Sequence, residues 1–395
     1  MPPPETRNPP SVGADEGSKS SNSGRGLKQK DTPAAKIVDD YRRERYRVDS
    51  VIKRILRVDA KRVDPNKYPA NVHRTIGCTW NRVGQVTLVK AKAADHYHYK
   101  GLAICANVWT CPLCASKIQE RRRQEVALLA VYAATINRQT FMASYTFPHR
   151  VDQPLSMLLR LQQAAIKKLR EGKGYVQLMA RSDYSGRVRA LELTHGDNGW
   201  HPHTHELLLL GHHVSADDLQ SDLAHLWLKA CRSVGLFLPE RDDVAAFLRH
   251  SVDVRAGDEG AAAYIAKMDD QTKWGISHEL TKSSSKQGRR SGRHPFHLAM
   301  EPSTSHLFVE YVHAMKGQRQ LVWSRGLKNQ VGLRDKSDEE IAEEETSHID
   351  DAILIPNEAW RFVIGNDARW ELTHAAKLDG EAGVRRYLQL LGWSE

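Results

Sequence analysis

The sequence predicts an α+β fold with a largely antiparallel β-sheet. Helical and extended patterns follow one another irregularly from residue 115 to residue 268, in the order helix, strand, helix, strand, strand, helix, strand, helix. Two of the predicted strands, at residues 188–195 and 201–210, are separated by the turn sequence GDNG at residues 196–199. Because so short a turn joins antiparallel strands, this pair predicts a β-hairpin.

The other elements of this region follow from their own patterns. Residues 115–137 predict a helix whose early turns carry Arg121, Arg122 and Arg123, and residues 139–147 predict a strand that ends at Pro148. Residues 155–169 and 215–234 are amphipathic and predict two more helices, with Cys231 at a core position of the second. Residues 250–254 predict a further strand.

The N-terminal part has two different compositions. Residues 1–36 carry six Pro, four Gly and five Ser and no aromatic residue, so we expect a disordered leader. Residues 41–62 carry nine Lys or Arg against three acids, and their apolar residues recur at helical spacing. The basic face of this predicted helix either contacts DNA phosphates or is simply solvated.

The overall charge is basic, with 58 Lys and Arg against 48 Asp and Glu and a sequence pI of about 9.3. Such a surplus suits a nucleic acid or another anionic surface as partner. No run approaches the ~20 apolar residues that a membrane helix needs. The N-terminus also has no apolar core of a signal peptide. We therefore expect a cytoplasmic protein with no membrane partner.

Four of the five cysteines crowd into one region. Cys111 and Cys114 form a CxxC pair, and Cys105 and Cys78 could complete a tetrahedral zinc site of four thiolates. In a cytoplasmic chain such clustering indicates a metal rather than disulfides. His96 and His98 are alternative fourth ligands, and a set of buried free thiols is the alternative to any metal site.

The hairpin carries a run of alternating histidines. In a strand His201, His203 and His205 would project from one face. Pairing of Glu192 with His205 and of Thr194 with His203 would place a carboxylate on the same face. Two imidazoles and a carboxylate make a site for a divalent metal with open positions. The alternative is a histidine-rich strand end near solvent.

A second candidate pair follows in the alanine-rich, helical stretch at residues 260–268. Tyr264 and Lys267 lie on one face of that helix. A neighbouring ammonium lowers the cost of a phenolate, so this tyrosine could be a nucleophile. A buried tyrosine with a lysine reaching to solvent is the alternative.

Together these motifs resemble those of the HUH endonuclease superfamily. HPHTHELLLL at residues 201–210 resembles the histidine motif, and YIAKM at residues 264–268 resembles the single-tyrosine motif. Their order resembles rolling-circle replication initiators (Rep proteins) of bacterial plasmids, in the branch with a cysteine-rich segment upstream. There a first cysteine precedes a GLxxC…WxCPxC segment, matched by Cys78 and by GLAICANVWTCPLC at residues 101–114. Residues 279–282, 293–296 and 317–327 also look similar, so the resemblance covers residues 74–335.

The resemblance implies a fold and a mechanism. The fold would be an HUH/RRM-like antiparallel sheet with helices on one side, a zinc-binding cysteine-rich module and a helical C-terminal region. His203 and His205, with Glu192 as third ligand, would hold Mg²⁺ or Mn²⁺, which polarises the scissile phosphate. Tyr264 would attack that phosphate, leaving a 5′-phosphotyrosine link and a free 3′-hydroxyl that primes synthesis, and Lys267 would offset the phosphate charge.

The resemblance also implies partners. These are plasmid origin DNA with a hairpin or single-stranded nick site, a host DNA helicase and the replicative polymerase.

Three positions need separate comment. Relatives often have a glutamate four residues before the tyrosine that activates water to end the cycle. Here that position is Gly260, and Glu259 points off the tyrosine's helical face unless the helix starts at Ala261. Thr204 stands where the motif usually has a bulky apolar residue. His201 falls outside the HxH pair, so we expect it to support the ligands or to contact DNA.

We expect four regions. They are a disordered leader (1–36), a basic helix with a cysteine-rich zinc module (37–135), an HUH endonuclease core (136–335), and an acidic linker with a small helical tail (336–395). Within the core, residues 281–293 carry five basic residues and either close on single-stranded DNA or form a solvated loop. Residues 338–351 carry eight acids and predict a linker or a solvated helix.

The function predicted is a replication initiator that nicks and rejoins one strand at a plasmid origin. Two alternatives stay open. One is a zinc-stabilised, sequence-specific DNA-binding regulator without catalysis. The other is an HUH transposase or relaxase, but relaxases tend to have the tyrosine near the N-terminus, whereas here it follows the histidines.

Overall fold

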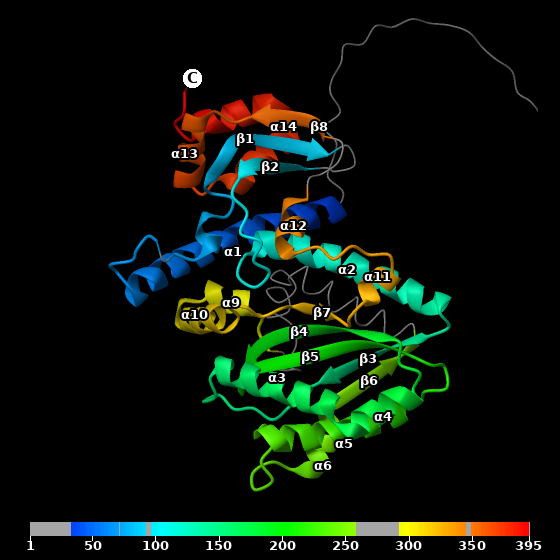
Figure 1. Ribbon diagram of the computed structural model, residues 1–395. Coiled ribbons are helices and arrows are strands. Elements are labelled where there is room, and N and C mark those ends of the chain that lie inside the picture. Colours follow the sequence, from blue (N-terminus) through cyan, green and yellow to red (C-terminus); the bar gives the residue numbers. More distant parts are fainter. Residues whose placement is uncertain (1–32, 71, 92–95, 258–291, 345–348, 395) are drawn as a thin grey trace, which may run out of the picture.

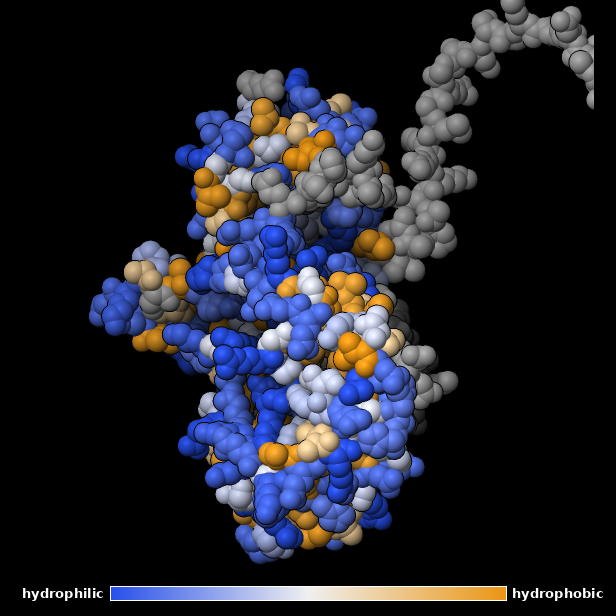
Figure 2. Space-filling model, turned by 45° about the vertical axis from the view of Figure 1, so that its right-hand side comes forward, coloured by the Kyte–Doolittle hydropathy of each residue, from blue (hydrophilic) through white to orange (hydrophobic). Residues whose placement is uncertain are grey.

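The computed structural model describes residues 33–70, 72–91, 96–257, 292–344 and 349–394, and it contains two antiparallel sheets with helices packed around each (Figure 1). The predicted α+β class with a largely antiparallel sheet is confirmed. Figure 2 shows that hydrophilic side chains cover most of the surface seen in that view, with hydrophobic ones in separate patches. No helix in the described ranges is long and apolar enough to cross a bilayer.

The larger sheet has five strands in the order β6-β3-β5-β4-β7. The predicted hairpin of β4 and β5 lies at its centre. The second half of β5 is buried, with Leu207, Leu208, Leu209 and Leu210 inaccessible to solvent. The strands are β3 (Gln139–Tyr145), β4 (Gly186–Gly196), β5 (Gly199–Leu210), β6 (Val252–Ala256) and β7 (Leu321–Trp323). All pairings are antiparallel.

Helices cover the two faces of this sheet unequally. Helices α3 (Leu155–Glu171), α4 (Lys173–Arg181) and α5 (Ala216–Val234) pack on one face, where Leu208 and Leu210 point. The other face carries Leu207 and Leu209, which pack against Val126 and Leu129 of α2 (Pro112–Thr135). The predicted helices at 115–137, 155–169 and 215–234 are confirmed, with α2 starting three residues earlier because Cys111 caps it.

The N-terminal helix α1 (Pro33–Val63) lies across the middle of the molecule and contacts α2, α9 (Pro295–Met300) and α10 (Ser305–Ala314) (Figure 1). Its apolar stripe of Val48, Ile52 and Leu56 enters the main core. The expected leader included residues 33–36, which is wrong for these four because the helix already begins at Pro33. Residues 1–32 lie outside the described part.

The smaller sheet has the order β2-β1-β8 and a core of its own. Its strands β1 (Arg82–Ala91) and β2 (Tyr97–Leu102) come from the cysteine-rich region, whereas β8 (Ile349–Leu354), α13 (Asn357–Gly365) and α14 (Arg369–Leu390) come from the C-terminus. The predicted helical tail is confirmed. The expectation of a linker or solvated helix at 338–351 is wrong in part. A short helix α12 (Asp338–Glu343) buries Ile341, and β8 pairs with β1 because Ile353 belongs to the second core.

The remaining elements are short. They are η1 (Arg74–Gly77), α6 (Val244–His250), η2 (Pro302–Thr304) and α11 (Leu327–Gln330). Strand β6 begins at Val252, two residues later than predicted, because His250 ends α6.

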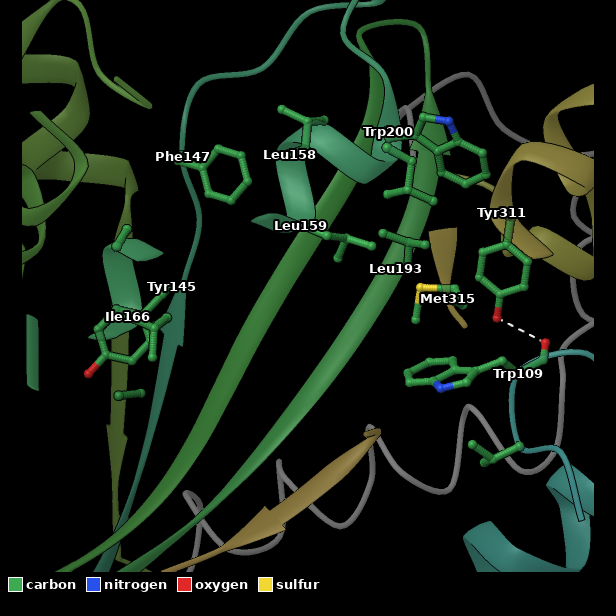
Figure 3. Close-up of a cluster of buried hydrophobic side chains, with 14 of the residues drawn as sticks. Trp109, Tyr145, Phe147, Leu158, Leu159, Ile166, Leu193, Trp200, Tyr311 and Met315 are labelled. Carbon is green, nitrogen blue, oxygen red and sulfur yellow. Dashed lines mark hydrogen bonds between the residues drawn. The ribbon is translucent and has the colours of Figure 1, made fainter. Parts of the chain in front are cut away.

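One buried cluster connects the cysteine-rich segment to the hairpin (Figure 3). Trp109 lies beside Leu193 of β4, Met315 and Tyr311, and the Tyr311 hydroxyl donates a hydrogen bond of 2.9 Å to the carbonyl oxygen of Trp109. The loop that carries two of the four clustered cysteines is therefore packed directly against the strand that carries Glu192.

Candidate metal centres

The β4–β5 turn sets the register of the histidine motif. Gly196 pairs with Gly199, so the loop has two residues, and a side chain on Gly199 (φ +84°) would place its Cβ 2.7 Å from the Cα of Val151. This register pairs Glu192 with His203. The expected pairing of Glu192 with His205 is therefore wrong. The partner of Glu192 lies two residues earlier on β5, because both strands continue up to the two-residue turn. The parity is as expected, and a shift by two residues keeps each side chain on its face.

Glu192, His203 and His205 meet on one face of the hairpin. Their potential ligand atoms all lie within 4.8 Å of one another. The Nε2 atom of His205 lies 2.7 Å from a carboxylate oxygen of Glu192. Its Nδ1 atom is hydrogen-bonded at 2.8 Å to the hydroxyl of Ser144, the residue that pairs with His205 on β3. Both ring nitrogens of His205 are thus oriented by the sheet itself.

The burial of this group suits a site that is open on one side. The side chain of His205 is 5% exposed and that of Glu192 is 23% exposed. Two imidazoles and one carboxylate supply three ligands to a divalent cation and leave positions for other oxygens. The residues present therefore fit a metal ion.

Other histidines surround the group. The ring of His201 stacks on that of His149 with centroids 4.3 Å apart, and its centroid lies 3.8 Å from that of His203. His201 therefore lies beside the three candidate ligands. Burial lowers the pKa of His149. The sequence did not single out His149, which lies just after the strand that ends before Pro148.

His294 is a further histidine near Glu192 that the sequence motifs do not include. It lines a small cavity together with Glu192, Trp109 and Tyr311. Burial, aided by His297, lowers the pKa of His294 to about 3 although Glu192 acts in the opposite direction. Residues 293–296 resemble a family segment, but no sequence signal gives His294 a role.

The four clustered cysteines form a second group. Cys78 follows η1, Cys111 caps α2 and Cys114 lies in its first turn, and all four side chains are buried. The sulfur of Cys78 lies 3.5 Å from that of Cys114 and 3.7 Å from that of Cys111, and Cys105 lies 3.7 Å from Cys114.

These separations fit a tetrahedral metal site better than disulfides. A disulfide requires about 2.05 Å between sulfurs. Zinc–sulfur bonds of about 2.3 Å in a tetrahedron place the sulfurs about 3.8 Å apart. Hydrogen bonds from Cys111, Cys114 and Cys78 lower the pKa of Cys105, whereas burial raises the pKa of Cys111. Neither His96 nor His98 belongs to the group, and Cys231 is a buried core residue apart from it.

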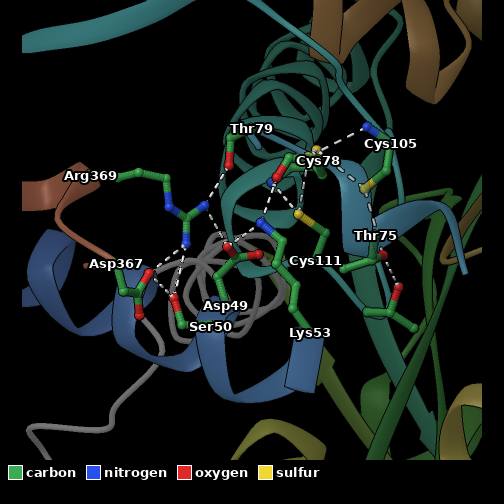
Figure 4. Close-up of polar contacts among 12 residues, drawn as sticks. Asp49, Ser50, Lys53, Thr75, Cys78, Thr79, Cys105, Cys111, Asp367 and Arg369 are labelled. Carbon is green, nitrogen blue, oxygen red and sulfur yellow. Dashed lines mark hydrogen bonds and ion pairs between the residues drawn. The ribbon is translucent and has the colours of Figure 1, made fainter. Parts of the chain in front are cut away.

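A buried polar network connects this cysteine group to the N-terminal helix α1 and to the C-terminal helix α14 (Figure 4). The Lys53 ammonium on α1 donates to the carbonyl oxygen of Cys78 at 2.5 Å and to Asp49 at 2.6 Å. Arg369, at the start of α14, contacts Asp49 at 2.8 Å and donates to the hydroxyl of Thr79 at 2.7 Å. The side chains of Lys53, Asp49 and Arg369 are fully buried.

The predicted tyrosine motif lies outside the described residues. This holds for Tyr264 and Lys267, for Glu259 and Gly260, and for most of the basic stretch at 281–293. The two candidate metal groups are therefore the part of the predicted site whose geometry can be stated.

Comparison with known proteins gives two matches. The chain is 24% identical over 364 residues to a protein named "Protein rep" from Streptomyces lividans, covering 73% of this chain and 78% of that protein. It is also 26% identical over 136 residues to a protein named "Neomycin resistance protein" from Streptomyces cyanogenus, covering 28% of this chain and 31% of that protein. No family model and no solved structure matches. The predicted resemblance to a Rep protein is thus confirmed along most of both chains.

Proposed function

We propose that this chain is a plasmid replication initiator that nicks one DNA strand at the origin and later rejoins it. The observation that carries the proposal is the convergence of Glu192, His203 and His205 on one face of the hairpin. The similarity to the Streptomyces lividans Rep protein supports the role in replication. Origin DNA is then the principal partner, with a host helicase and polymerase acting after the nick.

The three side chains would hold Mg²⁺ or Mn²⁺. A cation bound there polarises the scissile phosphate and stabilises charge on the leaving oxygen. The Ser144 hydroxyl would fix the His205 ring so that Nε2 faces the cation, in the way that outer-shell hydrogen bonds orient metal ligands. Glu192, 23% exposed, lies where a phosphate could approach.

Tyr264 is assigned the nucleophile on the family resemblance alone. Its oxygen would form a bond to phosphorus while the bond from phosphorus to the 3′ oxygen breaks. The phenol loses a proton to solvent and the 3′ oxygen gains one. The products are a 5′-phosphotyrosine and a free 3′-hydroxyl. Because a phosphodiester is kept in the adduct, rejoining needs no ATP. Lys267 would offset the phosphate charge.

The cysteine group would hold a structural zinc ion. Its role would be to fix the loop at 105–111, whose Trp109 donates from its indole nitrogen to the carbonyl oxygen of Gln318 at 2.8 Å. Trp109 and Glu192 line the same small cavity. Zinc would thus support the Glu192 side of the nuclease site without taking part in the chemistry.

The test is formation of a covalent protein–DNA adduct. Single-stranded oligonucleotides tiled across the DNA that flanks the gene are incubated with the full chain and Mn²⁺. Denaturing electrophoresis then separates adduct from free DNA. We expect an adduct with the wild-type protein, none with Tyr264→Phe, and wild-type yield with Tyr132→Phe, a matched change on α2.

The other outcomes separate the alternatives. An adduct that persists in Tyr264→Phe would move the nucleophile to another residue. Absence of any adduct together with tight duplex binding would favour a zinc-stabilised DNA-binding regulator. An adduct without preference for a hairpin at the origin would favour a transposase or relaxase of the same chemistry.

A further inference from the structure

An open pocket of about 570 Å³ lies on the face of the large sheet opposite to the histidine motif. It is formed by the end of α3, by α4 and by the start of β4. Its polar wall consists of three arginines, two tyrosines and one acidic residue; they are Arg138, Arg170, Arg187, Tyr175, Tyr184 and Asp183, and we call this the Arg–Tyr pocket. Glu206 of β5, which forms ion pairs with Arg170 and Arg187 of the wall, points away from the face of His205. The pocket therefore lies on the other side of the sheet.

Positive charge exceeds negative charge in the wall of this pocket, with three arginines against Asp183, and also around Glu206 beside it. Glu206 is fully buried, and one of its oxygens accepts a hydrogen bond from Arg170 and lies 3.4 Å from the Nε atom of Arg187. Arg189 on β4 is the direct cross-strand neighbour of Glu206 on β5. Burial, followed by the charge of Arg170, lowers the pKa of Arg189. Three guanidinium groups therefore surround one carboxylate.

Buried polar atoms in the wall also have unused bonding capacity. The Tyr175 side chain is 4% exposed, and within the described ranges its hydroxyl has no hydrogen-bond partner. The same holds for the Nε atom of Arg170 and for the second carboxylate oxygen of Glu206. Burying such groups without partners is costly, so a native structure rarely keeps several of them in one place. A ligand that accepts hydrogen bonds would satisfy Tyr175 and Arg170.

Hydrogen bonds fix the orientation of Arg138 at the rim of the pocket. The Nε atom of Arg138 donates to the carbonyl oxygen of Asp183 at 3.0 Å and to the hydroxyl of Ser185 at 2.9 Å. Arg187 donates to the Tyr184 hydroxyl at 3.2 Å. These bonds orient guanidinium groups that keep other N–H donors for a ligand, because each guanidinium has five.

We propose that the Arg–Tyr pocket binds a phosphate group, either of a DNA backbone or of a free nucleotide. Planar guanidinium groups match phosphate oxygens in pairs, and the partly exposed ring of Tyr184 offers a surface on which a base can stack. The pocket lies on the opposite sheet face from Glu192, His203 and His205. It would therefore hold a DNA segment, or a nucleotide, separate from the one at the nuclease site.

The test uses the full chain, with labelled oligo(dT) of about 20 nucleotides, unlabelled dTMP and inorganic phosphate as probes. Arg138→Gln removes a rim cation. Tyr175→Phe removes only a hydroxyl that bonds to no other described residue, so a purely structural role predicts no loss of stability. Arg181→Gln is the control, because this exposed arginine on α4 pairs with Asp222 and is absent from the pocket wall.

Binding of a DNA phosphate predicts roughly fivefold weaker oligo(dT) binding for Arg138→Gln, with a salt slope about 0.7 smaller. It also predicts weaker binding for Tyr175→Phe and no change for Arg181→Gln. Binding of a free nucleotide predicts instead that dTMP and phosphate raise the melting temperature of the wild type but not of the two pocket variants. If oligo(dT) binding is unchanged in both variants and neither small probe stabilises the wild type, the proposal is wrong. Adduct formation through Tyr264 is measured separately, so the two proposals can fail independently.

Discussion

A carboxylate oxygen of Glu192 lies 2.7 Å from the Nε2 atom of His205, although the direct partner of Glu192 across the hairpin is His203. The carboxylate thus reaches diagonally along the strand pair, past its direct partner. Such diagonal neighbours are within reach of long side chains on one sheet face. The consequence is a three-residue group in which each member can contact the same ion.

The first prediction concerns the hydrogen bond between Ser144 and His205, one of the three candidate ligands. Ser144→Ala removes the hydroxyl at Nδ1 of His205 and leaves the three candidate ligands in place. We expect Mn²⁺ affinity to fall about 10-fold or more, the usual cost of losing an outer-shell partner. His205→Gln should abolish both Mn²⁺ binding and nicking. Electron paramagnetic resonance titration of free Mn²⁺ measures the affinity, and unchanged binding in both variants would exclude this group as the metal site.

The second prediction concerns the cysteine group. We expect one zinc ion per wild-type chain, released by a thiol-modifying reagent and detected with a colorimetric chelator. Cys111→Ser should lose the ion and lower the melting temperature, because metal-binding energy contributes to folding. Cys231→Ala is the control, since Cys231 is buried but outside the group. Zinc retained in Cys111→Ser, or absent from the wild type, would contradict the assignment.

Part of both candidate metal groups follows from local rules in the sequence. Alternation in a strand places His203 and His205 on one face, and the CxxC spacing brings Cys111 and Cys114 into one helical turn. The contributions of Ser144, His149 and His294 depend instead on how separate segments meet. Ser144 could have been found from the predicted strand at 139–147 only if the β3–β5 register had been known.

The same limit explains the parts of the fold that were not predicted. Strand β1 pairs with β8 from the far end of the chain, for example Leu88 with Ile353. Neither stretch alternates clearly, and the acidic residues before Ile353 suggested a solvated segment. These strands are stabilised by a partner and by a shared core rather than by their own pattern.

The third prediction concerns the buried network beside Cys78. Asp49→Asn removes the negative charge of the carboxylate that contacts both Lys53 and Arg369. The two buried cations then lose this anionic partner. Breaking a buried ion pair in this way costs about 3–5 kcal/mol. Glu44→Gln, which removes an i,i+3 contact to Arg47 on the same helix, should cost at most about 0.5 kcal/mol. Urea unfolding of both variants provides the comparison, and equal midpoints would show that the network does not stabilise the fold.

The fourth prediction is a dependence of stability on pH through His98 of β2. Burial, with Lys117 and Lys100 adding to it, lowers the pKa of His98 to about 4. The unfolded chain takes up this proton near pH 6.5. The stabilisation from the neutral ring is therefore complete above about pH 6.5 and is lost as the pH falls toward 4.

His98→Gln should flatten this part of the stability profile. The ring is partly exposed, so solvent screening reduces the effect, and we expect the fall in melting temperature between pH 7 and pH 5 to shrink by about 1–3 °C. His212→Gln is the control because His212 is exposed on the loop after β5. Thermal unfolding followed by circular dichroism at a series of pH values checks this. Parallel profiles for the wild type and His98→Gln would show that His98 is not a source of the pH dependence.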